Sequence, residues 1–250
     1  MEWKIIHIDE TDSTNQWLKQ HGEGSFCVVA DYQTAGRGCG TNTWESERGQ
    51  NLLFSLLIHP ADIAANEQFR ITEAVSVALC ETLENLLRPL SPLDSSPHFG
   101  EHAISIKWPN DIYVGNKKIA GILIENRLKG NRIKDSIIGI GLNVNQREFH
   151  SDAPNPVSLC QLLGHEVDRE ALLHEFLYRK LSFSHAETTA VAYRNRLYLR
   201  GKPATYHDAN GWFRATILDV EPDGRLVMQD EEGKERRYSF KEVVFAINQH

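Results

Sequence analysis

The glycine-rich segment Ala35–Trp44 is the stretch of this chain best suited to chemistry. It reads Ala-Gly-Arg-Gly-Cys-Gly-Thr-Asn-Thr-Trp, so three glycines alternate with Arg37 and Cys39. Successive backbone N–H groups without a Cβ can point at one negative group, and the guanidinium of Arg37 adds a rigid fork of donors. The segment lacks the residues that a dinucleotide fingerprint or a P-loop requires. It predicts a loop that wraps a small anion, although a surface loop with glycines only at its turns stays open as an alternative.

Further polar clusters stand where predicted strands end. If the chain brings them together, the pocket holds two cations, one carboxylate and a tryptophan wall. That set suits an acid group that meets a nucleotide phosphate, and it lacks the Ser-His-Asp or Cys-His arrangement of a hydrolase. The clusters are Ser13-Thr14-Asn15, Gln33 to Trp44 with the cation Arg37, Lys107 to Asp111, Lys117-Lys118 with Gly121, and Asn143.

Two of these features also have a purely structural interpretation. Ser13-Thr14-Asn15 is the pattern of a plain helix N-cap. Gly139 and Gly141 lie two residues apart and so share one face of a predicted strand, where something flat can lie against the backbone. The alternative is that another element of the chain packs closely on that face.

The spacing of apolar residues predicts the elements that must position these clusters. From Leu197 onwards, short β-like runs alternate with turn sequences, which indicates a small β-barrel domain. A loop rich in proline and serine is expected at 89–100. Strands are predicted at 3–8, 26–32, 51–58, 103–108, 112–114, 117–125 and 136–144, and helices at 15–20, 69–87, within 154–163, and from Asp168 to about Tyr193.

Composition narrows the class of protein. A chain of 250 residues can bury one sizeable core with a small appended domain, and no apolar run approaches the ~20 residues of a membrane span. The four cysteines are scattered and the histidines lack zinc-ligand spacing, which suits a reducing cytosol and predicts no zinc. The net charge of −7 argues against a nucleic-acid partner. We therefore expect a cytoplasmic protein without a membrane or nucleic-acid partner.

Five motifs, taken in order, resemble those of the biotin–protein ligase family. This resemblance implies an α+β fold with a catalytic core like that of class II aminoacyl-tRNA synthetases, a mixed β-sheet with helices, over residues 1–196. It also implies a small SH3-like β-barrel over residues 197–250. The motifs are Asp12-Ser13-Thr14-Asn15, Gln33-Thr34-Ala35-Gly36-Arg37-Gly38, Lys107-Trp108-Pro109-Asn110-Asp111, Lys118-Ile119-Ala120-Gly121-Ile122-Leu123 and Gly139-Ile140-Gly141-Leu142-Asn143.

The resemblance implies a reaction in two steps. Biotin and ATP, with Mg²⁺, form biotinyl-5′-AMP, and a specific lysine of a biotin carboxyl carrier protein or domain then accepts the biotin. It implies that Arg37, Lys118 and Asp111 are catalytic, with Asp111 near the incoming lysine and near Mg²⁺. It assigns biotin to Ser13, Thr14, Asn15, Gln33, Gly36, Arg37, Gly38, Cys39, Lys118, Gly121 and Gly139, and ATP to Arg37, Trp44, Asn110, Lys118 and Asn143.

The sequence departs from the family pattern in its glycine loop. Many relatives carry a loop like Gly-Arg-Gly-Arg-Arg-Gly-Arg, whereas Cys39, Gly40, Thr41 and Asn42 stand here in place of the later basic residues. Arg37 is then the one cation of the loop, and we expect weaker electrostatic retention of the adenylate. We also expect the loop to become ordered only when ligand binds. Because the first predicted strand begins at Trp3, no winged-helix DNA-binding domain is expected before it.

Two other functions stay open at this stage. A lipoate–protein ligase would share the fold class and the adenylate chemistry. A biotin-sensing module would bind the ligand without turnover, and the presence of Arg37, Lys118 and Asp111 argues against it. The sequence leaves both a monomer and a homodimer open.

Overall fold

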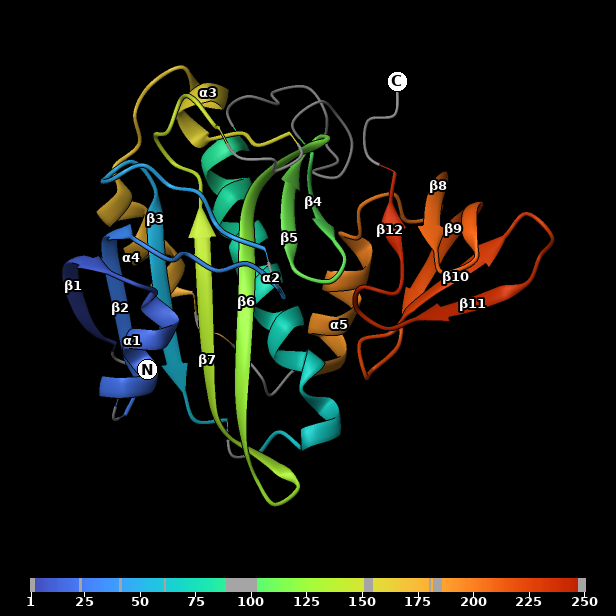
Figure 1. Ribbon diagram of the computed structural model, residues 1–250, viewed down its shortest axis with the longest axis horizontal. Helices are drawn as coiled ribbons and strands as arrows, with labels where there is room; N and C mark the ends of the chain where they lie inside the picture. The colour runs from blue at the N-terminus through green and yellow to red at the C-terminus, as the bar shows by residue number, and fades with distance from the viewer. Residues whose placement is uncertain are drawn as a thin grey trace.

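The computed structural model folds into a seven-stranded sheet with helices, followed by a separate five-stranded sheet (Figure 1). The structure describes residues 3–22, 24–40, 42–60, 62–88, 103–150, 155–179, 181 and 186–246. The loop predicted at 89–100 lies outside the described residues. Within the described part, no helix is both long enough and apolar enough to cross a membrane.

The larger sheet is mixed, as the sequence predicts. Strands β1 and β2 are parallel, and every other neighbouring pair is antiparallel. Strand β3 is buried along its whole length because its nearly continuous apolar run is covered on both faces. The strand order is β1 (Lys4–Thr11), β2 (Phe26–Gln33), β3 (Leu52–Ile58), β7 (Arg132–Leu142), β6 (Lys117–Lys129), β5 (Asp111–Val114) and β4 (Ile104–Lys107).

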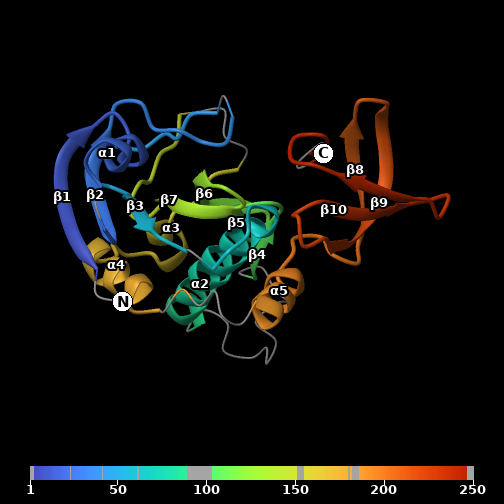
Figure 2. The same ribbon diagram turned by 90° about the horizontal axis from the view of Figure 1, so that it is seen from below.

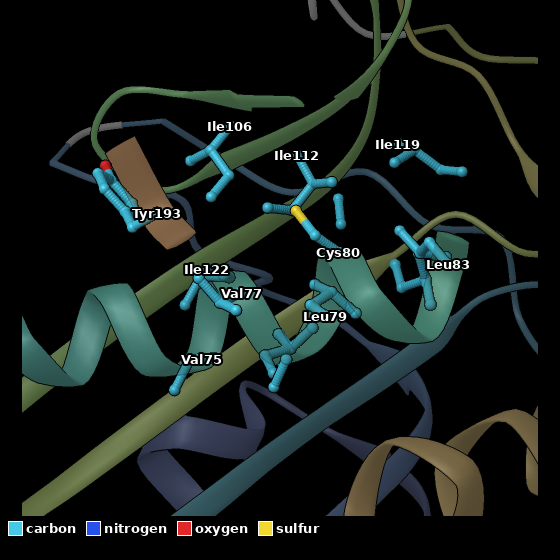
Figure 3. Packing of buried hydrophobic residues seen from close by; sticks show 14 of the residues in the cluster. Val75, Val77, Leu79, Cys80, Leu83, Ile106, Ile112, Ile119, Ile122 and Tyr193 are labelled. Carbon is cyan, nitrogen blue, oxygen red and sulfur yellow. The ribbon is translucent and has the colours of Figure 1, made fainter. Parts of the chain in front are cut away.

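Helices cover the two faces of this sheet unequally. Helix α1 (Thr14–His21) lies on one face, and α2 (Phe69–Leu87), α4 (Arg169–Tyr178) and α5 (Ala186–Asn195) lie on the other (Figure 2). Residues Val75, Leu79 and Leu83 recur along α2 at a spacing of four and are buried in the main core (Figure 3). Two short helical segments complete this part of the chain, η1 (Ala65–Glu67) and α3 (Leu159–Leu163).

The single helix predicted from Asp168 to about Tyr193 is wrong. Its start is correct, because the Asp168 carboxylate accepts hydrogen bonds from the backbone N–H groups of Glu170 and Ala171. The helix ends at Tyr178, since Arg179 has an extended backbone, and a new helix, α5, begins at Ala186. Both α4 and α5 pack on α2, so the two shorter helices bury residues against the same partner.

The C-terminal sheet is antiparallel and follows the predicted meander. Its turns fall at the three turn sequences that separate the predicted β-like runs. The strand order is β11 (Glu235–Tyr238), β10 (Leu226–Asp230), β9 (Gly211–Val220), β8 (Pro203–Asp208) and β12 (Val244–Phe245).

The C-terminal sheet is docked on the larger unit through the turn between β9 and β10. The indole N–H of Trp108 donates to the carbonyl oxygen of Gly224 over 2.9 Å. A Cβ added at Gly224 would lie 2.5 Å from the ring of Phe69, the first residue of α2. Glycine therefore permits the close approach that joins this turn to both α2 and the turn after β4.

Candidate active site

The two glycines of β7 form a flat floor on the face of the sheet that α1 covers. Alternation along the strand sends Ile138 and Ile140 into the main core and turns Gly139 and Gly141 to the opposite face. A Cβ at Gly139 would overlap the side-chain amide of Asn15, and a Cβ at Gly141 would overlap the indole of Trp44. Of the two interpretations that the sequence allowed, these contacts show packing by the chain itself, with a flat ring on Gly141.

A cavity of about 180 Å³ opens above this floor. Arg37 and Lys118, which are far apart in the sequence, both line it, as does Asp111. The volume is below the roughly 300–1,000 Å³ of typical small-molecule sites, and the Trp44 ring forms part of the lining. The predicted site residues that line the cavity are Ser13, Thr14, Asn15, Gln33, Arg37, Gly38, Cys39, Trp44, Asn110, Asp111, Lys118, Gly121 and Gly139.

One end of the cavity is a network of buried amides and hydroxyls. The side-chain oxygen of Gln33 accepts from the backbone N–H of Thr14 over 2.8 Å and from its hydroxyl over 3.1 Å. The hydroxyl oxygen of Ser55 lies 2.6 Å from both the Thr14 hydroxyl and the Asn15 amide oxygen. The Asn15 amide nitrogen donates to Glu125 over 2.9 Å. These bonds fix the side chains in place before any ligand arrives.

Ser13 occupies the N-cap position of α1 but does not cap it with its side chain. Its backbone is extended, with φ −161° and ψ 134°, and its hydroxyl makes no capping hydrogen bond. Only 4% of the residue is exposed, and it lines the cavity. The interpretation of Ser13 as a plain side-chain cap is therefore wrong, and the hydroxyl is available at the wall of the cavity.

A lysine–carboxylate pair stands beside the glycine floor. The Lys118 ammonium lies 2.7 Å from a carboxylate oxygen of Asp111, which is on the neighbouring strand β5. The same ammonium lies 5.6 Å from the centre of the Trp44 ring, within reach of a cation–π interaction. Gly121 allows this crowding, since a Cβ there would lie 3.0 Å from the indole and 3.5 Å from the Asp111 carboxylate.

The glycine loop turns back on itself over the cavity. The Gly38 N–H donates to the carbonyl of Asn42 over 2.8 Å, and the Trp44 N–H donates to that of Gly36 over 3.0 Å. The Asn110 amide donates to the Cys39 sulfur over 2.9 Å and also to the carbonyl of Ile122. The loop is thus attached to the turn after β4. Its predicted ordering on ligand binding stays a prediction.

Two predicted binding residues do not line the cavity. Gly36 is buried beneath the loop, where a Cβ would lie 2.6 Å from the carbonyl oxygen of Trp44. Asn143 is only 3% exposed, and its amide donates to the carbonyl of Val157 over 3.1 Å. Their assignments to biotin and ATP stay predictions, and both residues support the walls from behind.

Sequence reasoning missed several residues of the site. Ser55 is the one polar residue in the apolar strand β3. A single polar residue in a strand that is buried on both faces was the signal that could have revealed it. Glu125 accepts from Asn15 and pairs with Lys19 over 2.7 Å. Burial raises the pKa of Glu125, but hydrogen bonds from Lys19 and Asn15 outweigh it and leave the pKa below its ordinary value. The cavity is also lined by residues of the predicted clusters and motifs to which no ligand was assigned, namely Asn42, Thr43, Lys107, Ile122, Leu123 and Ile140. Phe240 lines it as well and lies outside all of the predicted clusters.

The lining also contains Lys107, a second lysine close to the ion pair of Lys118 and Asp111. The Lys107 ammonium lies 5.1 Å from the centre of the Phe245 ring, which belongs to the C-terminal sheet. Burial lowers its pKa, while the nearby charge of Asp111 acts in the opposite direction. Lys107, Asp111 and Lys118 therefore give this part of the cavity an excess of positive charge that suits an anion.

This fold and this site define a class of protein. The chain belongs to the biotin/lipoate A/B protein ligase family, whose sequence model matches residues 6–143. The bifunctional ligase/repressor BirA of Bacillus spizizenii is 30% identical over 245 residues, which cover 93% of this chain and 70% of that protein. The biotin–[acetyl-CoA-carboxylase] ligase of Paracoccus denitrificans is 31% identical over 173 residues, covering 66% of this chain and 67% of that protein.

A solved structure matches nearly the whole chain. The biotin protein ligase from Aquifex aeolicus, in complex with biotin and ATP, is 25% identical with a TM-score of 0.77. The match covers 98% of this chain and 99% of that chain. The likeness therefore includes the C-terminal sheet, which the family model does not reach.

Proposed function

We propose that this protein is a biotin–protein ligase, which activates biotin with ATP and transfers it to a lysine of a carrier protein. One observation carries the proposal: Arg37, Lys118 and Asp111 line a single cavity whose other end is a network of fixed amides and hydroxyls. Such a network suits the ureido ring of biotin, and the cations suit the junction of two anions. The relatives named above, including the biotin and ATP complex, support the same function.

In the first step, a carboxylate oxygen of biotin attacks the α-phosphorus of ATP. The bond from that phosphorus to the bridging oxygen breaks, and pyrophosphate leaves with the electron pair. Arg37 and Lys118 hold the biotin carboxylate and the α-phosphate together. Their charge offsets the repulsion between the two anions and stabilises charge that develops in the transition state.

Selection of biotin falls to Ser13, Thr14 and Gln33 at the opposite end. Hydrogen-bonding partners that are buried and already oriented discriminate strongly, because an analogue without the matching groups leaves them unpaired. In the second step, the lysine amine of the carrier attacks the carbonyl carbon of the adenylate. The carbon–oxygen bond to AMP breaks, AMP leaves with the electron pair, and the amine proton passes to Asp111.

Mg²⁺ is expected to accompany ATP. Asp111 is the one carboxylate among the residues that line the cavity within the described part of the chain. Mg²⁺ in nucleotide sites is commonly held by one or two carboxylates together with substrate phosphates, so this donor set fits the ion. When bound, the ion would neutralise phosphate charge. Asp111 would be the residue of this chain that holds it.

We assign the larger unit to the class II aminoacyl-tRNA synthetase-like core and the C-terminal sheet to an SH3-like barrel. A boundary at residues 196 and 197 is supported coarsely by the separate sheets. The Tyr198 N–H still donates to the carbonyl of Ile106 in the larger unit, whereas the Gly201 N–H donates to that of Ile217 in the C-terminal sheet. The chain therefore passes from one unit to the other between residues 198 and 201. The acceptor is a biotin carboxyl carrier domain. A cytoplasmic location is supported by four cysteines that are all free.

Biotin-dependent ATP–pyrophosphate exchange tests this function. A biotin ligase exchanges label between pyrophosphate and ATP only when biotin is present. A lipoate ligase would do so with lipoate instead, and a sensing module would bind biotin without any exchange. Exchange with biotin, followed by transfer to a carrier domain, supports the proposal; exchange with lipoate alone, or none with either acid, contradicts it.

A further inference from the structure

Glu125 on β6 stands behind the inner end of the cavity. It is not among the described residues that line the cavity, but its carboxylate accepts from the Asn15 amide nitrogen over 2.9 Å and lies 2.7 Å from the Lys19 ammonium. Burial raises the pKa of Glu125, but hydrogen bonds from Lys19 and Asn15 outweigh it, so the carboxylate is charged at neutral pH. A charged carboxylate only accepts hydrogen bonds, and the Asn15 amide must therefore turn its NH₂ group to Glu125.

This orientation fixes the direction of the next two hydrogen bonds. Asn15 turns its amide oxygen to Ser55, whose hydroxyl oxygen lies 2.6 Å away. An amide oxygen cannot donate, so the single hydroxyl proton of Ser55 lies on this contact. The equally short contact of 2.6 Å between Ser55 and Thr14 then requires the hydroxyl proton of Thr14. Thr14 shares that proton between Ser55 and the more distant side-chain oxygen of Gln33, at 3.1 Å.

These bonds leave the cavity with a hydroxyl oxygen that accepts. Thr14 is 4% exposed and lines the cavity, and its proton is engaged on the side of Ser55 and Gln33. Its remaining lone pair is therefore offered to an N–H group of a ligand, and the ureido ring of biotin carries two such groups. A hydroxyl that rotates freely offers either a proton or a lone pair, so the fixed polarity is imposed by the residues behind Thr14.

We propose that Glu125 is a positioning residue that sets the hydrogen-bond polarity of the cavity's inner end, and thereby selects a ligand with an N–H group facing Thr14. This inference rests on the proposed function. Glu125 acts through Asn15 and Ser55, and its charge makes the first bond of the series the strong one. Gly139 provides the room that Asn15 needs, because a Cβ there would overlap the side-chain amide.

Glu125→Gln should reverse the polarity without removing a hydrogen-bonding partner. The Lys19 ammonium, which now contacts one carboxylate oxygen of Glu125, holds the amide oxygen of the variant. The NH₂ group of the variant then faces Asn15, whose own amide turns over and donates to Ser55. The Ser55 proton moves to the contact with Thr14, and the Thr14 proton is released from Ser55. A ligand N–H then meets a hydroxyl that donates.

The test measures biotin-dependent exchange with the full chain. Its probes are biotin and the two cyclic carbamates of biotin, in each of which an oxygen replaces one ureido N–H. For the carbamate whose oxygen faces Thr14, wild type should prefer biotin by roughly 10²-fold or more, because an acceptor then meets an acceptor. Glu125→Gln should lower this preference about 10-fold and raise KM for biotin about 10-fold, with KM for ATP within about 2-fold.

Two further variants separate polarity from damage to the fold. Lys19→Met keeps the Glu125 carboxylate and should leave KM for biotin and the preference within about 2-fold of wild type. In the double variant Lys19→Met with Glu125→Gln, no ammonium holds the new amide, which can turn its oxygen to Asn15. Most of the preference should then return. A displaced α1 would weaken biotin and carbamate alike, and an effect through Arg37, whose charge also reaches Glu125, would raise KM for ATP as well.

The outcomes separate this inference from the proposed function. An unchanged preference in Glu125→Gln for both carbamates, or a double variant no closer to wild type than Glu125→Gln, overturns the role of Glu125. If wild type shows no biotin-dependent exchange, the proposed function fails. Calorimetric titration with biotin and the carbamates needs no turnover and still decides the role of Glu125: no binding to wild type, or equal preference in wild type and Glu125→Gln, rejects it.

Discussion

The two ends of the cavity are built in different ways. At the inner end, the buried Thr14, Asn15 and Ser55 and the half-buried Gln33 are joined by hydrogen bonds, and the buried Ser13 lies beside them. At the outer end, formed by Arg37, Phe240, and Gly40 with the Lys241 ammonium against it, the side chains are exposed, and the two cations have no ion-pair partner among the described residues. The comparison indicates that the groups which recognise the shape of a ligand are held rigidly on the sheet. The cations that attract an anion lie near the surface and are less constrained.

Lys118 stands between the two ends, and its loss should have the largest effect. We expect Lys118→Ala to lower biotin-dependent exchange by about 10²–10³-fold, because it removes charge that acts on the transition state. Steady-state exchange measures this directly. Lys117→Ala, which removes the exposed neighbouring lysine, should be nearly silent. The double variant Lys118→Ala with Asp111→Asn separates the lost cation from the carboxylate left unpaired. Unchanged exchange would falsify the role of Lys118.

Gly141→Ala should disturb the floor that both ends share. The new Cβ overlaps the Trp44 indole, so the ring must move, at a cost of about 1–3 kcal/mol for overpacking. Urea unfolding measures the stability and exchange measures the activity. In a Trp44→Ala background the same substitution should cost less, since the overlapping ring is gone. Equal costs in both backgrounds would mean that the indole does not rest on Gly141.

Ser55→Ala tests the fixed network at the inner end. Removing this buried hydroxyl leaves Asn15 short of a partner and should lower the free energy of unfolding by about 1–3 kcal/mol. KM for biotin should rise while KM for ATP stays constant. Ser76→Ala is a matched control, because the buried Ser76 hydroxyl has no hydrogen-bond partner within the described residues. If both variants lose the same stability, the network contributes nothing specific.

Glu73 on α2 lies outside both ends of the cavity, and its protonation should affect the stability of the fold. Burial raises its pKa from 4.5 to about 7, against the opposing charges of Arg194 and Arg70. Between those values the folded state binds more protons than the unfolded state, so the free energy of unfolding should fall as the pH rises through this window. Glu73→Gln removes that dependence. In urea unfolding, the free energy of unfolding of the variant relative to wild type should rise by the order of 1 kcal/mol from about pH 5 to about pH 8. If this free energy depends on pH in the same way in both proteins, the prediction is contradicted.

Local sequence signals predicted most of the elements but not their full lengths. The helix predicted at 69–87 coincides with α2, because its apolar spacing and its surroundings agree. The hairpin of β6 and β7 was predicted as 117–125 and 136–144, whereas the strands run to Lys129 and from Arg132. Most of the extra residues are charged, so the alternation of apolar and polar residues that reveals a strand in a sequence is weak there, although Ile133 and Asp135 are buried.

The candidate site was predictable where motifs mark it and unpredictable where the fold assembles it. Arg37, Asp111 and Lys118 stood out by residue type and spacing, and they do line one cavity. Lys241 could not be found in this way, since its approach to Gly40 depends on how two sheets dock. The loop without further basic residues led us to expect weak retention of the adenylate, and this stays a prediction.

The turn between β4 and β5 places Trp108, Pro109 and Asn110 in the cavity wall. Residues much later in the sequence hold this turn by hydrogen bonds. The Tyr193 hydroxyl donates to the carbonyl of Pro109, 84 residues away, and Trp108 donates to Gly224, 116 residues away. A nascent chain on the ribosome that has finished only the family-matching residues 6–143 lacks both fastenings. We therefore expect full activity only after residue 224 has emerged, because truncated products that keep every motif lack both of these hydrogen bonds.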